Sequence, residues 1–188
     1  NPVPVAAEFI RRVADVEAEL LREHGTHEHL GANFVTPTVV QGGDTDQINV
    51  IPSTAVVCLD IRTVPGVDHV ALNGRLTDLA GACGEPSGVL ASVEVVDDRP
   101  PVDTPVDHPM IVALARAHEA VTGGPAVYGG VPGATDGTIL TRDAGIPTVV
   151  YGPGGKWIAH QADEYVEVQE IIEATKVYAE TARLFLGG

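Results

Sequence analysis

The 188-residue sequence predicts a mixed α/β fold made of two domains, an α+β domain followed by an α/β domain. Three patterns support this prediction. Apolar residues recur at helical spacing over residues 4–24, and polar and apolar residues alternate over residues 56–62. Beyond Thr104, helical segments alternate with short apolar segments. The first two patterns are typical of a one-sided helix and of a half-buried strand.

The first domain has the predicted order helix, strand, strand, helix, strand. The expected elements are a helix over 4–24 stopped by Gly25, a strand over 34–40 ending at the glycines 42–43, an extended segment over 47–64, a helix over 70–83 and a strand over 89–96. The alternation sends one polar set to a single face of the sheet, namely Val56, Cys58, Asp60 and Arg62. We therefore expect the sheet to be covered on one side.

One more strand before Asn1 would complete the order βαββαβ. This ferredoxin-like split βαβ arrangement packs two helices on one face of an antiparallel sheet. We expect that missing first strand.

The second domain is predicted to alternate helices with short buried strands. The expected elements are helices over 109–121 and 136–143, strands over 126–128 and 147–151, and a final helix over 168–186 that packs on this second sheet. Charges and prolines cluster between Asp97 and Thr104, which predicts a domain boundary there. The domains are accordingly residues 1–100 and 101–188.

Composition excludes several classes of function. The net charge of -15 argues against nucleic acid and anionic membranes as partners, since phosphate backbones require clustered Lys and Arg. No apolar run reaches the roughly 20 residues of a membrane span, and no signal peptide is seen, so we expect a cytoplasmic protein that binds small solutes. The two cysteines, Cys58 and Cys83, are expected to be reduced thiols in the core.

A glycine-rich segment over residues 152–164 is the strongest candidate for chemistry. It follows a predicted buried strand, and ligands of open α/β sheets bind beyond the carboxyl ends of strands. His160 is the candidate metal ligand, with Asp163 as the carboxylate that fixes its tautomer. The alternative is a surface histidine, with Asp163 and Glu164 favouring the start of the final helix.

A second glycine-rich turn over residues 129–137 precedes a short predicted helix. Its backbone, at Gly133 and Ala134, is a candidate for holding a substrate carboxylate. The alternative is a tight connection in which Asp136 caps the helix. The remaining histidines are expected on the solvated surface: His24, His27, His29, His69, His108 and His118.

The motifs together resemble a metallopeptidase family, the one that groups acetylornithine deacetylase, succinyl-diaminopimelate desuccinylase, aminoacylase and glutamate carboxypeptidase. The matching segments are residues 49–52 with 60–62, residues 133–137 with 145–147, and residues 152–154 with 159–160 and 163–166. The resemblance covers essentially the whole chain. It implies that residues 1–100 are a lid and dimerisation domain, incomplete at its N-terminus. Residues 101–188 are then the C-terminal part of a zinc-peptidase catalytic domain.

The resemblance also implies an activity. The intact enzyme would be a metal-dependent hydrolase that cleaves the amide bond of N-acyl amino acids or small peptides, with two zinc ions per subunit, or cobalt or manganese. His160 would hold one metal, and Arg62 and Asn49 are candidates for the substrate carboxylate or for charge on the tetrahedral intermediate. For Arg62 the alternative is an ion pair with Asp60.

The family's other metal ligands precede the lid domain, and no segment here matches them, so we expect the chain alone to be inactive. The resemblance further implies a homodimer formed through the lid domain. Two alternatives stay open, a non-catalytic dimerisation module and a small-molecule-binding regulatory domain. The sequence does not indicate which acyl group or amino acid is cleaved.

Overall fold

The first helix forms because the chain provides a cap, an apolar face and a stop. The computed structural model describes residues 1–155, 158–159 and 161–187. In it, α1 (Pro2–His24) begins after Asn1, whose side chain accepts a hydrogen bond from the Val3 amide, and it ends at Gly25, where φ is 64°. Its buried face consists of Val13, Val16 and Leu20. The predicted helix over 4–24 is confirmed.

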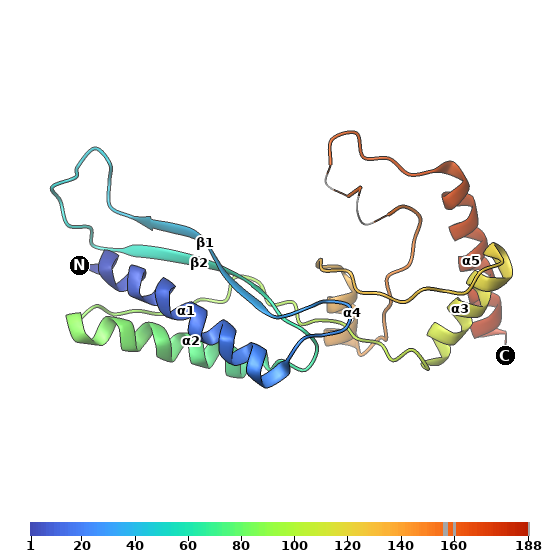
Figure 1. The fold of residues 1–188 in the computed structure, drawn as a ribbon, viewed down its shortest axis with the longest axis horizontal. Coiled ribbons are helices and arrows are strands. Elements are labelled where there is room, and N and C mark those ends of the chain that lie inside the picture. The colour runs from blue at the N-terminus through green and yellow to red at the C-terminus, as the bar shows by residue number, and fades with distance from the viewer. Residues whose placement is uncertain (156–157, 160, 188) are drawn as a thin grey trace. The chain divides into compact units, whose positions relative to one another are not determined.

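The chain divides into two compact units, Asn1–Pro101 (unit 1) and Val102–Gly188 (unit 2). The fold is mixed α/β, and the described residues form one two-stranded sheet, which lies in unit 1 (Figure 1). Within the described part of the chain, no helix combines the length and the apolar character needed to cross a bilayer.

The sheet of unit 1 is a hairpin of two antiparallel strands, β1 (Phe34–Gly42) and β2 (Ala55–Arg62). Their register runs from Phe34 opposite Arg62 to Gly42 opposite Ala55, with an irregularity between Pro37 and Val39. The expectation of an extended segment over 47–64 is wrong before Ala55. There the chain makes turns, such as the one closed by the hydrogen bond from the Val50 amide to the Gln47 carbonyl.

The alternation predicted for β2 is confirmed. Leu59 and Ile61 pack on the core, while Cys58, Asp60 and Arg62 are exposed on the other face. Only one side of the hairpin is therefore covered by α1 and by α2 (His69–Gly84), which lie side by side along it (Figure 1). Cys58 is an exposed free thiol, so its placement in the core is wrong, whereas Cys83 is buried as expected.

The core of unit 1 forms where α1, β1 and α2 meet. Asp68 caps α2 by accepting hydrogen bonds from the amides of Val70 and Ala71, and a single 3-10 turn, η1 (Glu85–Ser87), follows the helix. The buried cluster comprises Val13, Val16, Leu20, Val35, Leu72, Leu76, Leu79 and Cys83.

The strand predicted over residues 89–96 is not formed. The segment is irregular, Leu90 and Val96 are almost fully exposed, and Val93 packs against the core. A strand needs a neighbour to satisfy its backbone groups, and no described strand pairs with this segment.

The described residues of unit 2 form three helices: α3 (Pro109–Thr122), α4 (Gly137–Ala144) and α5 (Val168–Leu186). All three predicted helices are confirmed, and the last has the predicted ends. Its expected packing on a second sheet is wrong, because α5 packs against α3. The residues buried on these two helices are Ile111, Ala113 and Ala117 of α3 and Ala174 and Val177 of α5.

The strands predicted over 126–128 and 147–151 are also absent from the described structure. Val127 is 94% exposed, and the Thr148 backbone is satisfied by a side chain instead of a strand partner. The Thr104 hydroxyl donates to the Thr148 carbonyl (2.6 Å) and accepts from the Thr148 amide (3.2 Å). A short segment cannot become a strand without a neighbouring one, and the described residues of unit 2 provide none.

Candidate functional site

Arg62 is the last residue of β2 and points away from the core. Its Nε donates to the Asp60 carboxylate at 2.8 Å, and both side chains are about half exposed. The ion pair left open as an alternative is therefore present, and exposed pairs of this kind contribute only about 0–1 kcal/mol. The two terminal nitrogens of Arg62 make no hydrogen bond with a described residue. These two nitrogens remain available to bind a carboxylate.

Asn49 lies in the exposed loop that joins β1 to β2. That loop starts and ends at the Gly42–Ala55 end of the hairpin, whereas Arg62 lies at the opposite end, beside Phe34 (Figure 1). Seven residue steps along β2 separate the two ends, roughly 23 Å at the usual rise of a strand. The structure therefore does not bring these two predicted substrate contacts together within one chain.

The turn at residues 133–137 exposes Gly133 and Ala134. Asp136 occupies the position before α4, but its side chain makes no capping hydrogen bond. Thr135 makes the side-chain hydrogen bond at this helix start instead: its hydroxyl accepts from the Gly137 amide at 3.2 Å. The alternative interpretation, in which Asp136 caps α4, is therefore wrong. The Asp136 carboxylate is exposed.

The segment that leads to the proposed metal ligand is attached to α5 at two points. The Tyr178 hydroxyl donates to the Tyr151 carbonyl at 2.5 Å, and the Gly154 amide donates to the Glu170 carboxylate at 2.9 Å. Gly154 has φ 86°, a value that favours glycine. The chain therefore enters the glycine-rich segment in a fixed direction.

Tyr151 also contacts α3. Its hydroxyl lies 3.0 Å from His118 Nδ1, and its ring packs edge-on against the rings of both His118 and Tyr178. Burial raises the pKa of the Tyr151 phenol above its ordinary value, and the nearby Tyr178 and Glu173 add to this effect. Both effects disfavour the phenolate form of Tyr151.

His160, the expected metal ligand, lies outside the described residues. Asp163, its expected partner, is exposed and has φ 59°, a left-handed conformation that is uncommon for a residue other than glycine. Since α5 begins at Val168 with Glu170 as the acidic residue of its first turn, Asp163 and Glu164 lie before that helix. They do not form its N-terminal turn.

A metal centre requires several ligating side chains that lie close together. Zinc is usually held by about four protein or water ligands, and the described residues contain no group of three or more His, Cys, Asp or Glu side chains suited to a metal ion. The described part of the chain therefore does not fit a complete zinc site by itself.

Two polar clusters were not predicted from the sequence. His69 contacts Thr63 and Asp98, and His118 contacts Tyr151; both histidines are partly buried, so their placement on the solvated surface is wrong. The partners lie 29 residues apart for His69 and Asp98 and 33 residues apart for His118 and Tyr151. No local pattern in the sequence indicates such distant pairs.

Comparison with known proteins gives one family. The model of Peptidase family M20/M25/M40 matches residues 7–184. A LysW-lysine/LysW-ornithine hydrolase of Saccharolobus solfataricus is 26% identical over 167 residues, covering 88% of this chain and 44% of the relative. A probable succinyl-diaminopimelate desuccinylase of Staphylococcus epidermidis is 26% identical over 174 residues, covering 91% of this chain and 42% of the relative.

Among solved structures, an M20 family metallo-carboxypeptidase, Sso-CP2 from Sulfolobus solfataricus, has a similar fold. The TM-score is 0.61 at 19% identity, and the match covers 95% of this chain and 44% of the other. The chain thus spans less than half the length of the curated relatives that it matches.

Proposed function

The chain belongs to peptidase family M20/M25/M40, and from this premise we propose that the intact polypeptide containing it is a metal-dependent hydrolase. The reaction is cleavage of the amide bond of N-acyl amino acids or small peptides. The family match over residues 7–184 supports this proposal most directly. The similar relatives include a hydrolase named for LysW-linked lysine and ornithine and a probable desuccinylase.

His160 is the metal ligand that this chain contributes under the proposal. The expected metal is zinc, two ions per subunit, with cobalt or manganese as substitutes. A divalent metal polarises a carbonyl and lowers the pKa of bound water, which is the chemistry that amide hydrolysis needs. The remaining ligands would come from other parts of the polypeptide. Asp163 would orient the imidazole, and Asp136 would support the turn before α4 from its exposed position.

Arg62 binds the substrate carboxylate in this proposal. The support is its exposure and the two guanidinium nitrogens that remain beside its contact with Asp60. The backbone of Gly133 and Ala134, exposed in the turn before α4, is the second proposed contact. Both features suit an anionic, carboxylate-bearing substrate.

The position of Asn49 supports the proposal of a homodimer. It lies at the end of the hairpin opposite Arg62, so one protomer cannot use both residues on one carboxylate. In a two-fold dimer formed through the lid domain, each subunit can contribute its Asn49 loop to the site of the other. The domain roles follow, with residues 1–100 as lid and residues 101–188 as part of the catalytic domain. We expect the protein in the cytoplasm.

The lid is proposed to be a ferredoxin-like βαββαβ domain with one further strand beside β2. One edge of β2 pairs with β1, and the other is unpaired among the described residues. β1 contains Pro37 and an irregularity, devices that protect an edge, whereas β2 has neither. In the intact polypeptide we expect hydrogen exchange across residues 55–62 to be slower than in the isolated chain. Equal exchange would contradict the additional strand.

Hydrolysis by the intact polypeptide tests the proposed activity. Purified protein should release amino acids from N-acetyl or N-succinyl amino acids, and a chelator should abolish the release. His160→Ala should lower both the bound metal, measured by mass spectrometry, and the rate, whereas the matched control His29→Ala, in an exposed loop, should change neither. Unchanged metal content in His160→Ala would remove the ligand assignment. Absence of hydrolysis would favour a non-catalytic dimerisation or small-molecule-binding module.

A further inference from the structure

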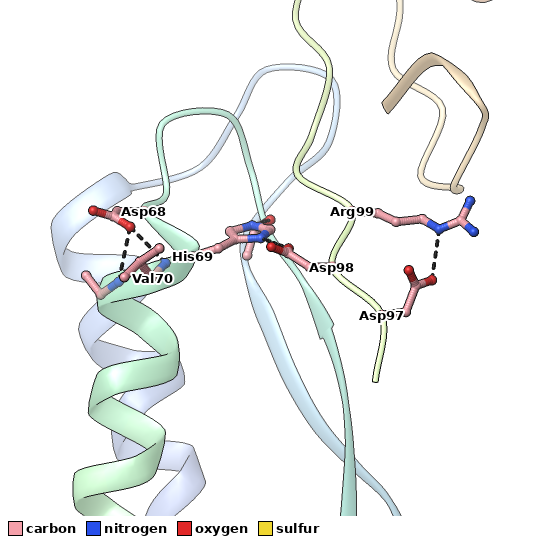
Figure 2. A network of polar contacts seen from close by, with 8 residues as sticks. Asp68, His69, Val70, Asp97, Asp98 and Arg99 are labelled. Carbon is pink, nitrogen blue, oxygen red and sulfur yellow. Dashed lines mark hydrogen bonds and ion pairs between the residues drawn. The ribbon is translucent and has the colours of Figure 1, made fainter. Parts of the chain in front are cut away.

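His69, the first residue of α2, uses both of its ring nitrogens. Nε2 lies 2.9 Å from the Thr63 hydroxyl, and Nδ1 lies 2.5 Å from the Asp98 carboxylate. The side chain is only 19% exposed. Figure 2 shows the ring between the start of α2 and the segment that carries Asp98. Asp68 caps the helix, so the contacts of His69 are not part of the cap.

The contact with Thr63 fixes the end of β2. The ladder between the strands ends at Arg62, so Thr63 and Val64 have no strand partner in the described part of the chain. They are held by side chains instead, because Thr63 contacts His69 and the Val64 amide donates to the buried Asn33 at 2.8 Å. Arg62 is the last paired residue of β2. Holding the adjacent Thr63 at the start of α2 therefore limits the movement of the backbone that carries Arg62.

The contact with Asp98 fixes a second segment. Residues 89–98 make no strand, and Asp98 stands three residues before Pro101, the last residue of unit 1. Its neighbours Asp97 and Arg99 pair with each other at 2.8 Å (Figure 2). The His69 ring thus joins the end of β2 to the stretch of chain that leads out of unit 1.

We propose that His69 is a positioning residue for Arg62: through Thr63 it sets the direction in which Arg62 is presented, and through Asp98 it links that direction to the connection between the two units. The inference rests on the proposed function, in which Arg62 binds the substrate carboxylate. When Nδ1–H donates to Asp98, Nε2 is left to accept the Thr63 hydroxyl, so the two contacts support one another.

The test compares two substrates of the intact polypeptide, an N-acetyl amino acid and the same compound with a carboxamide in place of its carboxylate. Thr63→Val keeps the shape of the side chain and removes the hydroxyl, and Asp98→Asn removes the charge that orients the ring. Each should reduce the preference for the carboxylate about three-fold to ten-fold, mainly through KM, as expected for the loss of one hydrogen bond. The control Asp97→Asn, which does not contact His69, should leave the preference unchanged.

The same substitutions in an Arg62→Ala background separate positioning from a general structural role. If His69 acts through Arg62, Thr63→Val and Asp98→Asn should cause no further loss there. An equal further loss, or a full carboxylate preference in Thr63→Val, would overturn the inference. A preference that Arg62→Ala itself leaves unchanged would refute the proposed role of Arg62, and the inference with it. A normal preference in the single variants beside a damaged Arg62→Ala would refute the inference alone.

Hydrogen exchange of the intact polypeptide gives a readout that does not depend on turnover. Asp98→Asn should speed exchange not only near residue 98 but also in the peptide over residues 55–66, because the ring transmits the change to Thr63. Faster exchange confined to residues near 98 would contradict the link. Thermal unfolding of each variant identifies any that fail to fold, and Thr63→Ala or Asp98→Ala, which remove the same contacts, replace those.

Discussion

Unit 1 and unit 2 satisfy their backbone groups in different ways. Unit 1 pairs two strands and covers them with α1 and α2 around a shared buried cluster. The described part of unit 2 has helices but no strand, and its extended segments are held by side chains, as where Thr104 bonds Thr148. A helix satisfies itself locally, whereas a strand depends on a neighbour. Several described apolar residues outside the helices of unit 2 therefore stay exposed, as Val127 does.

The largest expected effect on stability comes from shortening a buried side chain in the core of each unit. Leu76→Ala, at a position only 2% exposed, should lower the free energy of unfolding of unit 1 by about 2–5 kcal/mol. Val177 is fully buried on α5, which packs against α3. Val177→Ala removes fewer carbon atoms than Leu76→Ala and should lower the free energy of unfolding of unit 2 by roughly 1–2 kcal/mol. Urea unfolding measures both: far-UV circular dichroism follows the whole chain, and hydrogen exchange of peptides from residues 102–188 follows unit 2.

If the units are independent, Leu76→Ala should leave the unfolding transition of unit 2 in place. Equal shifts of both transitions in both variants would show that the units unfold together. In that case the two units could not be compared as separate folding units.

The next largest effect on stability is expected where an added Cβ would lie too close to neighbouring atoms, at two glycines. A Cβ at Gly84, the last residue of α2, would lie 2.2 Å from the Val89 carbonyl oxygen, which is backbone and cannot turn aside. A Cβ at Gly137 would lie 2.8 Å from a methyl group of Thr148, which can move. We expect Gly84→Ala to cost about 1–3 kcal/mol and Gly137→Ala less, measured by urea unfolding. A greater loss at Gly137 would mean that the segment around Thr148 is the more rigid of the two.

The helices could be predicted from the sequence because their signals are local. Apolar spacing and the stop at Gly25 give α1, and Pro109 marks the start of α3. The strands over 89–96, 126–128 and 147–151 were wrongly predicted because an apolar segment does not reveal whether a partner strand is present. The same limit applies to the site. The alternation in β2 gives the face of Arg62, but nothing near His69 in sequence points to Asp98.

Asn33 sets the end of the hairpin, and its loss should have an effect of similar or smaller size. The side chain is 1% exposed, and its carbonyl oxygen accepts the hydrogen bond of the buried Val64 amide. Asn33→Ala would leave that amide without a partner, which costs about 1–3 kcal/mol. The control Thr104→Ala removes a comparable contact from unit 2 and should leave unit 1 unaffected. An unchanged unfolding midpoint in Asn33→Ala would mean that water reaches Val64.

The smallest effect concerns ion pairs at the surface of each unit. Glu23 of α1 and Arg75 of α2 form a two-fold contact at 2.7 and 2.9 Å, and the hydrogen bond from Arg75 lowers the pKa of Glu23 below its ordinary value of 4.5. In unit 2, Arg183 lowers the pKa of Glu180 in the same way, but both residues belong to α5. A depressed carboxyl pKa contributes stability above the unfolded value, and that contribution disappears as the pH falls through the folded one.

Stability should therefore decline below pH 4.5, and Arg75→Gln should make the decline of unit 1 less steep. Arg183→Gln should alter unit 2 less, because a pair within one helix can partly persist in the unfolded chain, so that less is lost on unfolding. Urea midpoints at neutral pH and at a pH well below 4.5 measure the difference, and high salt should reduce it for both exposed pairs. An equal effect of the two substitutions would mean that linking two helices adds nothing to an ion pair beyond its local contact.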